Sequence, residues 1–543
     1  MARIKKILGS RLAEIICFLF AIGNRVVFTS LYSLIGADTK LQLAYAENLL
    51  AGKGMGITKY FANDLTTPVF DTKQFFPPGF SFTIIPFLKL TGGDEYKAVF
   101  IFDTLVAILF IIAIRFAGKK AGLPSWLNNI MILLAGTSQY LFFTSWSSTD
   151  AICVCLLLFA LGEIVTMISK KQKIRPLPIV GCSMLFCLPF FFRYMYLPIP
   201  LLLPLLIVFS GIIVKNRSLK IGGLYILLTS ACILGILFTY SLLTAGNVLY
   251  TMSFERGLFI SQLELCYPFL PASFINVDFG AQLIATISGV DYAQVIVFFK
   301  IITLVLFITL LVLFCRYLFI QKRSILFSDH SLFITIGSVI SFTIAFLLIY
   351  LTVTYKELNW GFYRWVHSVE SRYFAFIYVF VPLVLFTALY HYSFSFKKLF
   401  VRFFVVLALC SLGIETIHGV YYNIKILSKH KSLEYIRDAD KSFRNFPAII
   451  TQIKKQNPDS EIIICSPDKF YLYTSSQMGY RTIFDFENFL KTDLTVSEKT
   501  IFIMPIQTQD VSIIKDFITA KKPRLLTEMA GSSVYIFELN PTF

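Results

Sequence analysis

The sequence predicts a polytopic α-helical membrane protein with a small α/β domain at its C-terminal end. Of its 543 residues 56% are hydrophobic and only 15% are charged, whereas a soluble globular protein carries about 25% charged residues. Apolar runs close to the roughly 20 residues that cross a bilayer recur along most of the chain. From about residue 421 these runs shrink to strand length. This composition excludes an ordinary soluble enzyme.

The distribution of charge predicts the orientation in the membrane. The net charge of +17 comes from 49 lysines and arginines against 32 acidic residues. The basic residues fall in short clusters between the apolar spans, as the positive-inside rule predicts, and not along one polar face. We therefore expect a cytoplasmic N-terminus and no nucleic-acid partner. The cytoplasmic clusters lie at 119–120, 170–175, 215–220, 322–323 and 397–402.

About 11 crossings satisfy this charge pattern, each near the length that a bilayer needs. They lie at about 12–35, 96–117, 124–144, 148–169, 177–192, 195–213, 221–242, 294–319, 331–353, 372–392 and 400–420. The apolar stretch 79–91 follows Pro77-Pro78-Gly79 and is too short to cross without tilting. We expect it to be re-entrant or interfacial.

The segments 36–78, 243–293 and 354–371 then face the external side. In the first, residues 39–50 place apolar side chains at helical spacing, which predicts an amphipathic helix at the membrane surface. Asp38 precedes this helix directly. Its carboxylate suits a helix N-cap, the interpretation that spacing favours, and it also suits a general base acting on an acceptor hydroxyl or amine.

Residues 421–543 are predicted to form an extracytoplasmic α/β domain, and residues 1–420 the transmembrane domain. Strand-length runs at 462–464 and 501–504 alternate with helical patterns around 443–456 and 509–519. This C-terminal part has no glycine-rich phosphate loop, no paired histidines and no cysteine cluster. We expect it to have a structural or acceptor-docking role.

The stretch 36–54, GADTKLQLAYAENLLAGKG, resembles the first external loop of the GT-C glycosyltransferase superfamily. In that loop an acidic residue precedes an A-x-N-L-x-x-G-x-G helix end, and a Pro-Pro-Gly follows. Other recurrent positions of the superfamily resemble Ser148-Thr149-Asp150, Arg193-Tyr194 and Glu370-Ser371-Arg372-Tyr373. The similarity covers about residues 10–400. The terminal domain resembles that of bacterial aminoarabinose transferases and protein O-mannosyltransferase relatives.

The resemblance implies a GT-C-like enzyme of a bacterial cytoplasmic membrane. Such an enzyme moves a sugar from a polyprenyl-phosphate-linked donor to a glycan, lipid or protein acceptor on the outer face, with inversion. Asp38 matches the catalytic base of the family. The donor phosphate requires fixed cationic groups in a low-dielectric cavity, and Arg372 and Arg193 are the leading candidates because arginine stays charged and can contact phosphate bidentately. Glu370 and Tyr373 flank Arg372 and are further candidate site residues.

The sequence also departs from the family pattern. Many relatives carry two adjacent acids in this loop, whereas Asp38 is followed by Thr39. Aminoarabinose transferases have an acid before the proline, where residues 74–76 here are Gln-Phe-Phe. Both departures weaken the case for a metal site and for aminoarabinose as the sugar, so no cofactor is expected. Asp64 and Asp71 are alternative candidates for a second carboxylate.

Further polar residues have two interpretations each. Asp150 and Arg193, both at outer helix ends, either pair structurally or contact the donor. His367 belongs to a polar cluster over the external mouth, but a lone histidine is more often structural than a ligand, so no metal is assigned to it. Arg25 and Asp103 lie in apolar spans, where an ionisable group indicates either a functional site or a buried ion pair.

Two other functions are compatible with a polytopic chain. A transporter or lipid flippase usually shows internal repeats, and this sequence has none that we detect. A polysaccharide polymerase or ligase usually has a large arginine-rich loop late in the chain, whereas the segment 243–293 has Arg256 as its only basic residue. The glycosyltransferase hypothesis is favoured because an acid follows the first crossing directly in a large outer loop.

Overall fold

The structure is a computed structural model. It describes residues 6–31, 37–61, 64–72, 76–137, 149–169, 176–213, 217–245, 277–298, 354–359, 362–367, 448–466, 481–483, 500–507, 524–529 and 532–538, with isolated residues and short pieces between 215 and 519. The expected crossings at 294–319, 331–353, 372–392 and 400–420 lie largely outside these residues. The expected number of crossings therefore stays a prediction.

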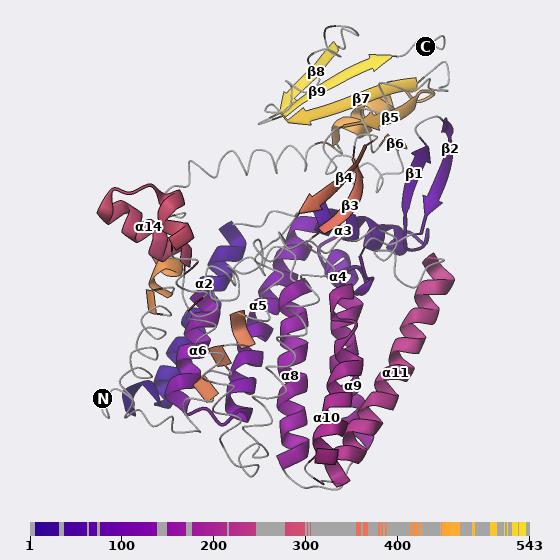
Figure 1. The fold of residues 1–543 in the computed structure, drawn as a ribbon. Helices are drawn as coiled ribbons and strands as arrows, with labels where there is room; N and C mark the ends of the chain where they lie inside the picture. Colours follow the sequence, from indigo (N-terminus) through magenta and orange to yellow (C-terminus); the bar gives the residue numbers. More distant parts are fainter. Residues whose placement is uncertain are drawn as a thin grey trace.

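Long apolar helices stand side by side in a bundle (Figure 1). They are α2 (Arg11–Leu31), α5 (Glu95–Lys120), α6 (Ser125–Thr137), α8 (Thr149–Ser169), α9 (Pro176–Phe192), α10 (Ile199–Ile213) and α11 (Arg217–Ala245). Each corresponds to one of the first seven expected crossings. A helix satisfies its backbone hydrogen bonds internally, which a segment in lipid must do. Within the described ranges, Arg11–Thr29, Glu95–Lys120 and Lys220–Leu243 are long and apolar enough to cross a membrane.

The helices pack around a continuous apolar core in which small residues allow close approach. A Cβ atom at Gly136 of α6 would lie 2.4 Å from the Cα of Ala21 on α2, so only glycine fits at this crossing. Beside it, the amide nitrogen of Asn24 donates to the carbonyl of Gly136 at 2.8 Å. On α5, Phe110 and Ile111 are fully buried in the same core.

Several polar segments gather at one end of this bundle, which we call the α3 end. Helix α3 (Ala37–Leu50) contacts α4 (Gly79–Leu90), and α4 contacts α5. A Cβ at Gly79 would lie 2.5 Å from the carbonyl oxygen of Phe191 in the last turn of α9. Helices α5, α8 and α10 begin at the α3 end, and α9 ends there (Figure 1).

Helix α4 covers the apolar stretch that was expected to be re-entrant or interfacial. Its first residue lies against the end of α9, and its last residue is followed within a few positions by the start of α5. Both of its ends are thus at the α3 end. Its 12 residues span about 18 Å, against about 30 Å of hydrocarbon. Helix α4 does not cross the bundle, in agreement with the expectation.

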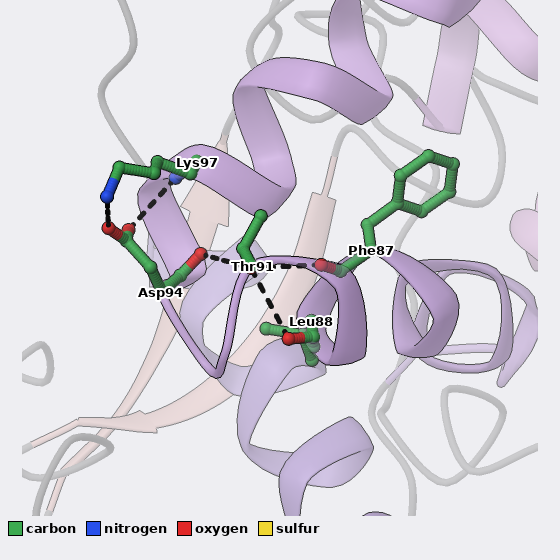
Figure 2. A network of polar contacts seen from close by, with 5 residues as sticks. All are labelled: Phe87, Leu88, Thr91, Asp94 and Lys97. Carbon is green, nitrogen blue, oxygen red and sulfur yellow. Dashed lines mark hydrogen bonds and ion pairs between the residues drawn. The ribbon is translucent and has the colours of Figure 1, made fainter.

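The turn between α4 and α5 is fixed by polar contacts (Figure 2). Gly92 and Gly93 adopt φ angles of 66° and 88°, which favour glycine. The Thr91 hydroxyl donates to the Phe87 carbonyl at 2.9 Å, and the Asp94 carboxylate accepts from the backbone N–H of Lys97 at 3.0 Å. Asp94 is therefore the N-cap of α5, and it sets where that helix begins.

Two β-hairpins lie in the segments expected to be external. The first joins β1 (Ile57–Phe61) to β2 (Asp64–Asp71), and the second joins β3 (Thr354–Asn359) to β4 (Phe362–His367), both antiparallel. Neither hairpin was expected from the sequence. Helix α14 (Val277–Ser288) was also not expected within the segment 243–293.

The C-terminal part contains a five-stranded sheet with the order β6-β5-β7-β9-β8. Strand β5 is parallel to both β6 and β7, and β9 is antiparallel to β7 and β8. The strands are β5 (Glu461–Cys465), β6 (Arg481–Ile483), β7 (Thr500–Gln507), β8 (Arg524–Met529) and β9 (Ser532–Glu538). The sheet lies beyond the α3 end (Figure 1), and its edge strand β6 contacts β1. The strands expected at 462–464 and 501–504 are confirmed.

Candidate functional site

The proposed base, Asp38, lies in the first turn of α3. The helix begins at Ala37, two residues earlier than the sequence predicted. Asp38 is therefore inside the helix and is not the residue that caps it, which corrects the N-cap interpretation. A negative charge in the first helical turn is favoured by the helix dipole and by the backbone N–H groups that have no partner within the helix. The Asp38 side chain is outside the described part of the structure.

Helix α3 is enclosed by protein and does not lie open on a surface. Residues 39–46 are all buried. Leu43 and Ala46 join the core of the bundle, whereas Tyr45 packs with Met55 and Ile57 in a separate cluster. The helix expected at 39–50 is confirmed, but its residues 39–46 are buried on all faces and not on one apolar face. Its position at the membrane surface stays a prediction. The sequence showed the apolar spacing but not the second, smaller cluster, which forms because β1 folds back over α3.

Two polar hydrogen bonds also hold α3 in place. The amide nitrogen of Asn48 donates to the carbonyl of Gly56 at 2.8 Å, which ties the end of α3 to the residue before β1. The hydroxyl of Ser81 on α4 donates to the carbonyl of Gln42 at 2.8 Å. Helix α3 is thus connected to the elements on both sides of it.

Lys40, Glu47 and Glu95 form a charged cluster between α3 and α5. Lys40 Nζ pairs with Glu95 Oε2, and their side chains are 5% and 11% exposed. The ammonium group also lies 5.1 Å from the centroid of the Tyr96 ring. Burial raises the pKa of Glu47 to about 9, and the adjacent Glu95 carboxylate, to which Glu47 is hydrogen-bonded, acts in the same direction, whereas Lys40 opposes the shift. This shift in the pKa favours the neutral form of Glu47.

Sequence reasoning missed this cluster. The spacing of seven residues between Lys40 and Glu47 places them on one face of a helix, and this was the available signal. Glu95 was not recognisable as their partner because it joins them only through the return of α4.

Asp150 and Arg193 form a buried ion pair at the α3 end. Asp150 lies in the first turn of α8, and Arg193 follows α9 directly. Arg193 Nη2 donates to Asp150 Oδ2 at 2.8 Å, and the side chains of Arg193 and Asp150 are 11% and 1% exposed, respectively. Of the two sequence-based interpretations, structural pairing is confirmed. Contact with a donor stays a prediction.

The candidate second carboxylates lie at opposite ends of β2. Asp71 pairs with Ile57 at the base of the β1–β2 hairpin, whereas Asp64 pairs with Phe61 beside its turn. Seven residues of strand separate them by about 24 Å. Because Ile57 packs against α3, the backbone of Asp71 is the nearer of the two to that helix.

The remaining predicted site residues are placed only in part. His367 is the last residue of β4 and pairs with Thr354; its side chain is outside the described residues. Glu370, Arg372 and Tyr373 also lie outside them. In the part of the chain that the structure describes, no group of three or more histidine, cysteine, aspartate or glutamate side chains is arranged to hold a metal ion.

Arg25 and Arg115, two arginines on helices of the bundle, have structural partners. Arg25 on α2 is buried, donates to the carbonyl of Ala135 at 3.1 Å, and lies with its guanidinium carbon 4.7 Å from the Phe110 ring centroid. It interacts electrostatically with Asp103 on α5. At the opposite end of the bundle from α3, Arg115 pairs with Glu14 of α2.

Comparisons by sequence identify no relative: no protein-family model matches the chain, and no curated protein matches it. Comparison with solved structures defines the class of the fold. Its matches include two solved structures of ArnT, so the chain shares the overall fold of that protein.

The solved structures include ArnT, the aminoarabinose transferase, from Cupriavidus metallidurans. In its apo state ArnT matches with a TM-score of 0.52 at 11% sequence identity, over 97% of this chain and 98% of that chain. ArnT bound to undecaprenyl phosphate matches with a TM-score of 0.51 at the same identity and coverage. The apo oligosaccharyltransferase of Archaeoglobus fulgidus gives a TM-score of 0.48 at 11% identity, over 86% of this chain and 64% of that chain.

Proposed function

We propose that this protein is an integral membrane glycosyltransferase that takes a sugar from a polyprenyl-phosphate-linked donor. The acceptor is a glycan, lipid or protein on the outer face of a bacterial cytoplasmic membrane. The observation that carries the proposal is the likeness in fold over 97% of the chain to ArnT, a protein solved in complex with undecaprenyl phosphate. The acid in the first turn of α3 supports it.

The reaction is a single inverting displacement. The acceptor hydroxyl or amine attacks the anomeric carbon of the donor sugar and gives its proton to the Asp38 carboxylate. The bond between the anomeric carbon and the phosphate oxygen breaks, and the electron pair leaves with the polyprenyl phosphate. The negative charge on that phosphate requires fixed cationic groups nearby.

Arg372 is the first candidate for this phosphate contact. Arg193 is the second, because its guanidinium is already paired with the buried Asp150 carboxylate. Asp71 is preferred to Asp64 as a second acid near the acceptor, since it lies at the base of the hairpin that packs on α3. Glu370, Tyr373 and His367 are the remaining candidate site residues.

The test is transfer of radiolabelled sugar by purified protein in detergent, with a panel of polyprenyl-phosphate donors. We expect turnover by the wild type and its loss in Asp38→Asn and Arg372→Ala. The matched controls are Asp459→Asn and Lys455→Ala, which change exposed residues after the helical stretch 448–456 and within it. Both controls should transfer sugar like the wild type.

Two outcomes would contradict the proposal. A folded wild-type protein that turns over no donor would favour a transporter or lipid flippase, or a polysaccharide polymerase or ligase. Undiminished transfer by Asp38→Asn would exclude Asp38 as the base while leaving the reaction class intact.

A further inference from the structure

Apolar packing alone does not explain the charged cluster of Lys40, Glu47 and Glu95 between α3 and α5. Two carboxyl groups share one ammonium group in a site where the Lys40 and Glu95 side chains are 5% and 11% exposed. Two ionised carboxylates beside one lysine would leave a net negative charge in a poorly hydrated place. With Glu47 protonated, the cluster is neutral, and the Glu47 hydroxyl donates to the Glu95 carboxylate.

Each member of the cluster lies on an element whose position matters for the proposed reaction. Lys40 is two residues after Asp38 in the first turns of α3, and Glu47 is near the other end of the same helix. Glu95 is the first residue of α5, directly after the N-cap Asp94. The capped turn of Figure 2 therefore fixes the carboxylate that both α3 residues contact.

We propose that Lys40, Glu47 and Glu95 form a positioning cluster that holds α3, and with it Asp38, against the start of α5. This inference rests on the proposed function, because Asp38 matters only if sugar transfer occurs. The three residues do not contact substrate in the proposal. They act through the placement of the helix that carries the base.

The proton on Glu47 makes this positioning dependent on pH. When Glu47 ionises, it faces the Glu95 carboxylate, and only Lys40 compensates for the two negative charges. Other titratable groups of the surrounding elements must be considered as well. They are Tyr45 on α3, Lys89 on α4, Asp94, Tyr96 and Lys97 at the start of α5, and Lys59 and Tyr60 on β1. The side chains of the two β1 residues are outside the described part of the structure. All of them are retained in a Glu47→Gln variant, which isolates the proton on Glu47.

The experiment compares the wild type with Glu47→Gln, Lys40→Met and the double variant Lys40→Met/Glu95→Gln. The double variant leaves no unpaired buried charge, so it keeps the test open if Lys40→Met does not fold. Lys53→Met, an exposed lysine just after α3, is the matched control. The readouts are kcat and donor KM between pH 6 and 10, and hydrogen–deuterium exchange of the peptide covering residues 41–50.

We expect kcat to fall at least about tenfold in Lys40→Met and in the double variant, with donor KM within about twofold of wild type and faster exchange in residues 41–50. We expect Glu47→Gln to keep transferring sugar at least about one pH unit further into the alkaline range than the wild type. Lys53→Met should match the wild type in every readout.

Several results would overturn the inference. A fall in kcat without faster exchange in α3 would mean that Lys40 acts on the substrate directly, and faster exchange without a change in kcat would mean that the cluster is only structural. If kcat falls at the same alkaline pH in the wild type and in Glu47→Gln, the proton on Glu47 has no role in positioning α3. If no donor is turned over, the proposed function fails, but exchange still tests separately whether the cluster holds α3.

Discussion

Replacing Glu47 by glutamine should change how the stability of the protein depends on pH. In the folded protein, burial and the Glu95 carboxylate raise the pKa of Glu47 to about 9 from its ordinary value of 4.5. Between these two values the folded state holds a proton that the unfolded chain has lost. The stabilisation is therefore complete below pH 4.5 and is lost as the pH rises to about 9, by at most about 1.4 kcal/mol for each pH unit.

The magnitude follows from that slope. Between pH 5 and pH 8, the shifted pKa of Glu47 lowers the free energy of unfolding of the wild type by about 4 kcal/mol when solvent screening is neglected. Glu47 is only partly buried, so solvent screening reduces the effect, and we take about 2–3 kcal/mol. Glutamine does not ionise, so this loss is absent from Glu47→Gln. Groups that do not interact with Glu47 titrate alike in both proteins and cancel in the comparison.

Thermal unfolding of both proteins in one detergent, followed by tryptophan fluorescence at pH 5, 6.5 and 8, measures this difference. The variant should gain at least about 2 °C in Tm relative to wild type between pH 5 and pH 8. Asp459→Asn, at an exposed position, should show a constant difference from wild type. A constant difference for Glu47→Gln would refute the reasoning, because it would mean that Glu47 is ionised in the folded protein.

Three further predictions follow from other contacts. Arg193→Met should destabilise the protein by about 3–5 kcal/mol, because it leaves the Asp150 carboxylate buried and unpaired. Thermal unfolding should show that adding Asp150→Asn recovers much of this stability. No recovery would contradict the loss of the ion pair as the cause. Gly136→Val should cost about 1–3 kcal/mol or more, since its Cβ meets the backbone of α2; an unchanged Tm would exclude this close approach. Asp71→Asn should lower sugar transfer at least tenfold more than Asp64→Asn; equal effects would contradict the preference for the hairpin base.

The helices could be predicted from the sequence because a backbone inside a bilayer must satisfy its own hydrogen bonds, and an apolar segment does so as a helix. The apolar runs at 96–117 and 148–169 became α5 and α8 with boundaries within a few residues. Each helix closes its own hydrogen bonds, so its existence depends only on local composition. The β1–β2 hairpin was missed because its polar, irregular sequence shows no clear alternation. Its strands also depend on pairing with each other and on packing against α3.

The candidate site could be predicted only where topology alone brings residues together. Asp150 and Arg193 lie at the same end of neighbouring antiparallel helices, so their pairing was foreseeable once the crossings were counted. Lys40 and Glu95 are 55 residues apart. They meet because α4 returns along the end of the bundle and does not cross it. A crossing at 79–91 would have put Glu95 at the other end, so this contact depends on one non-local feature.

The surroundings of the two acidic residues of α3 favour opposite protonation states. Glu47 lies among buried groups beside another carboxylate, which favours the neutral form of its side chain. Asp38 lies in the first turn of the same helix, where free backbone N–H groups favour a negative charge. A general base must be ionised before it can accept a proton. One helix thus offers a neutral acid suited to binding α5 and a carboxylate suited to catalysis, which explains why Asp38 and not Glu47 is the proposed base.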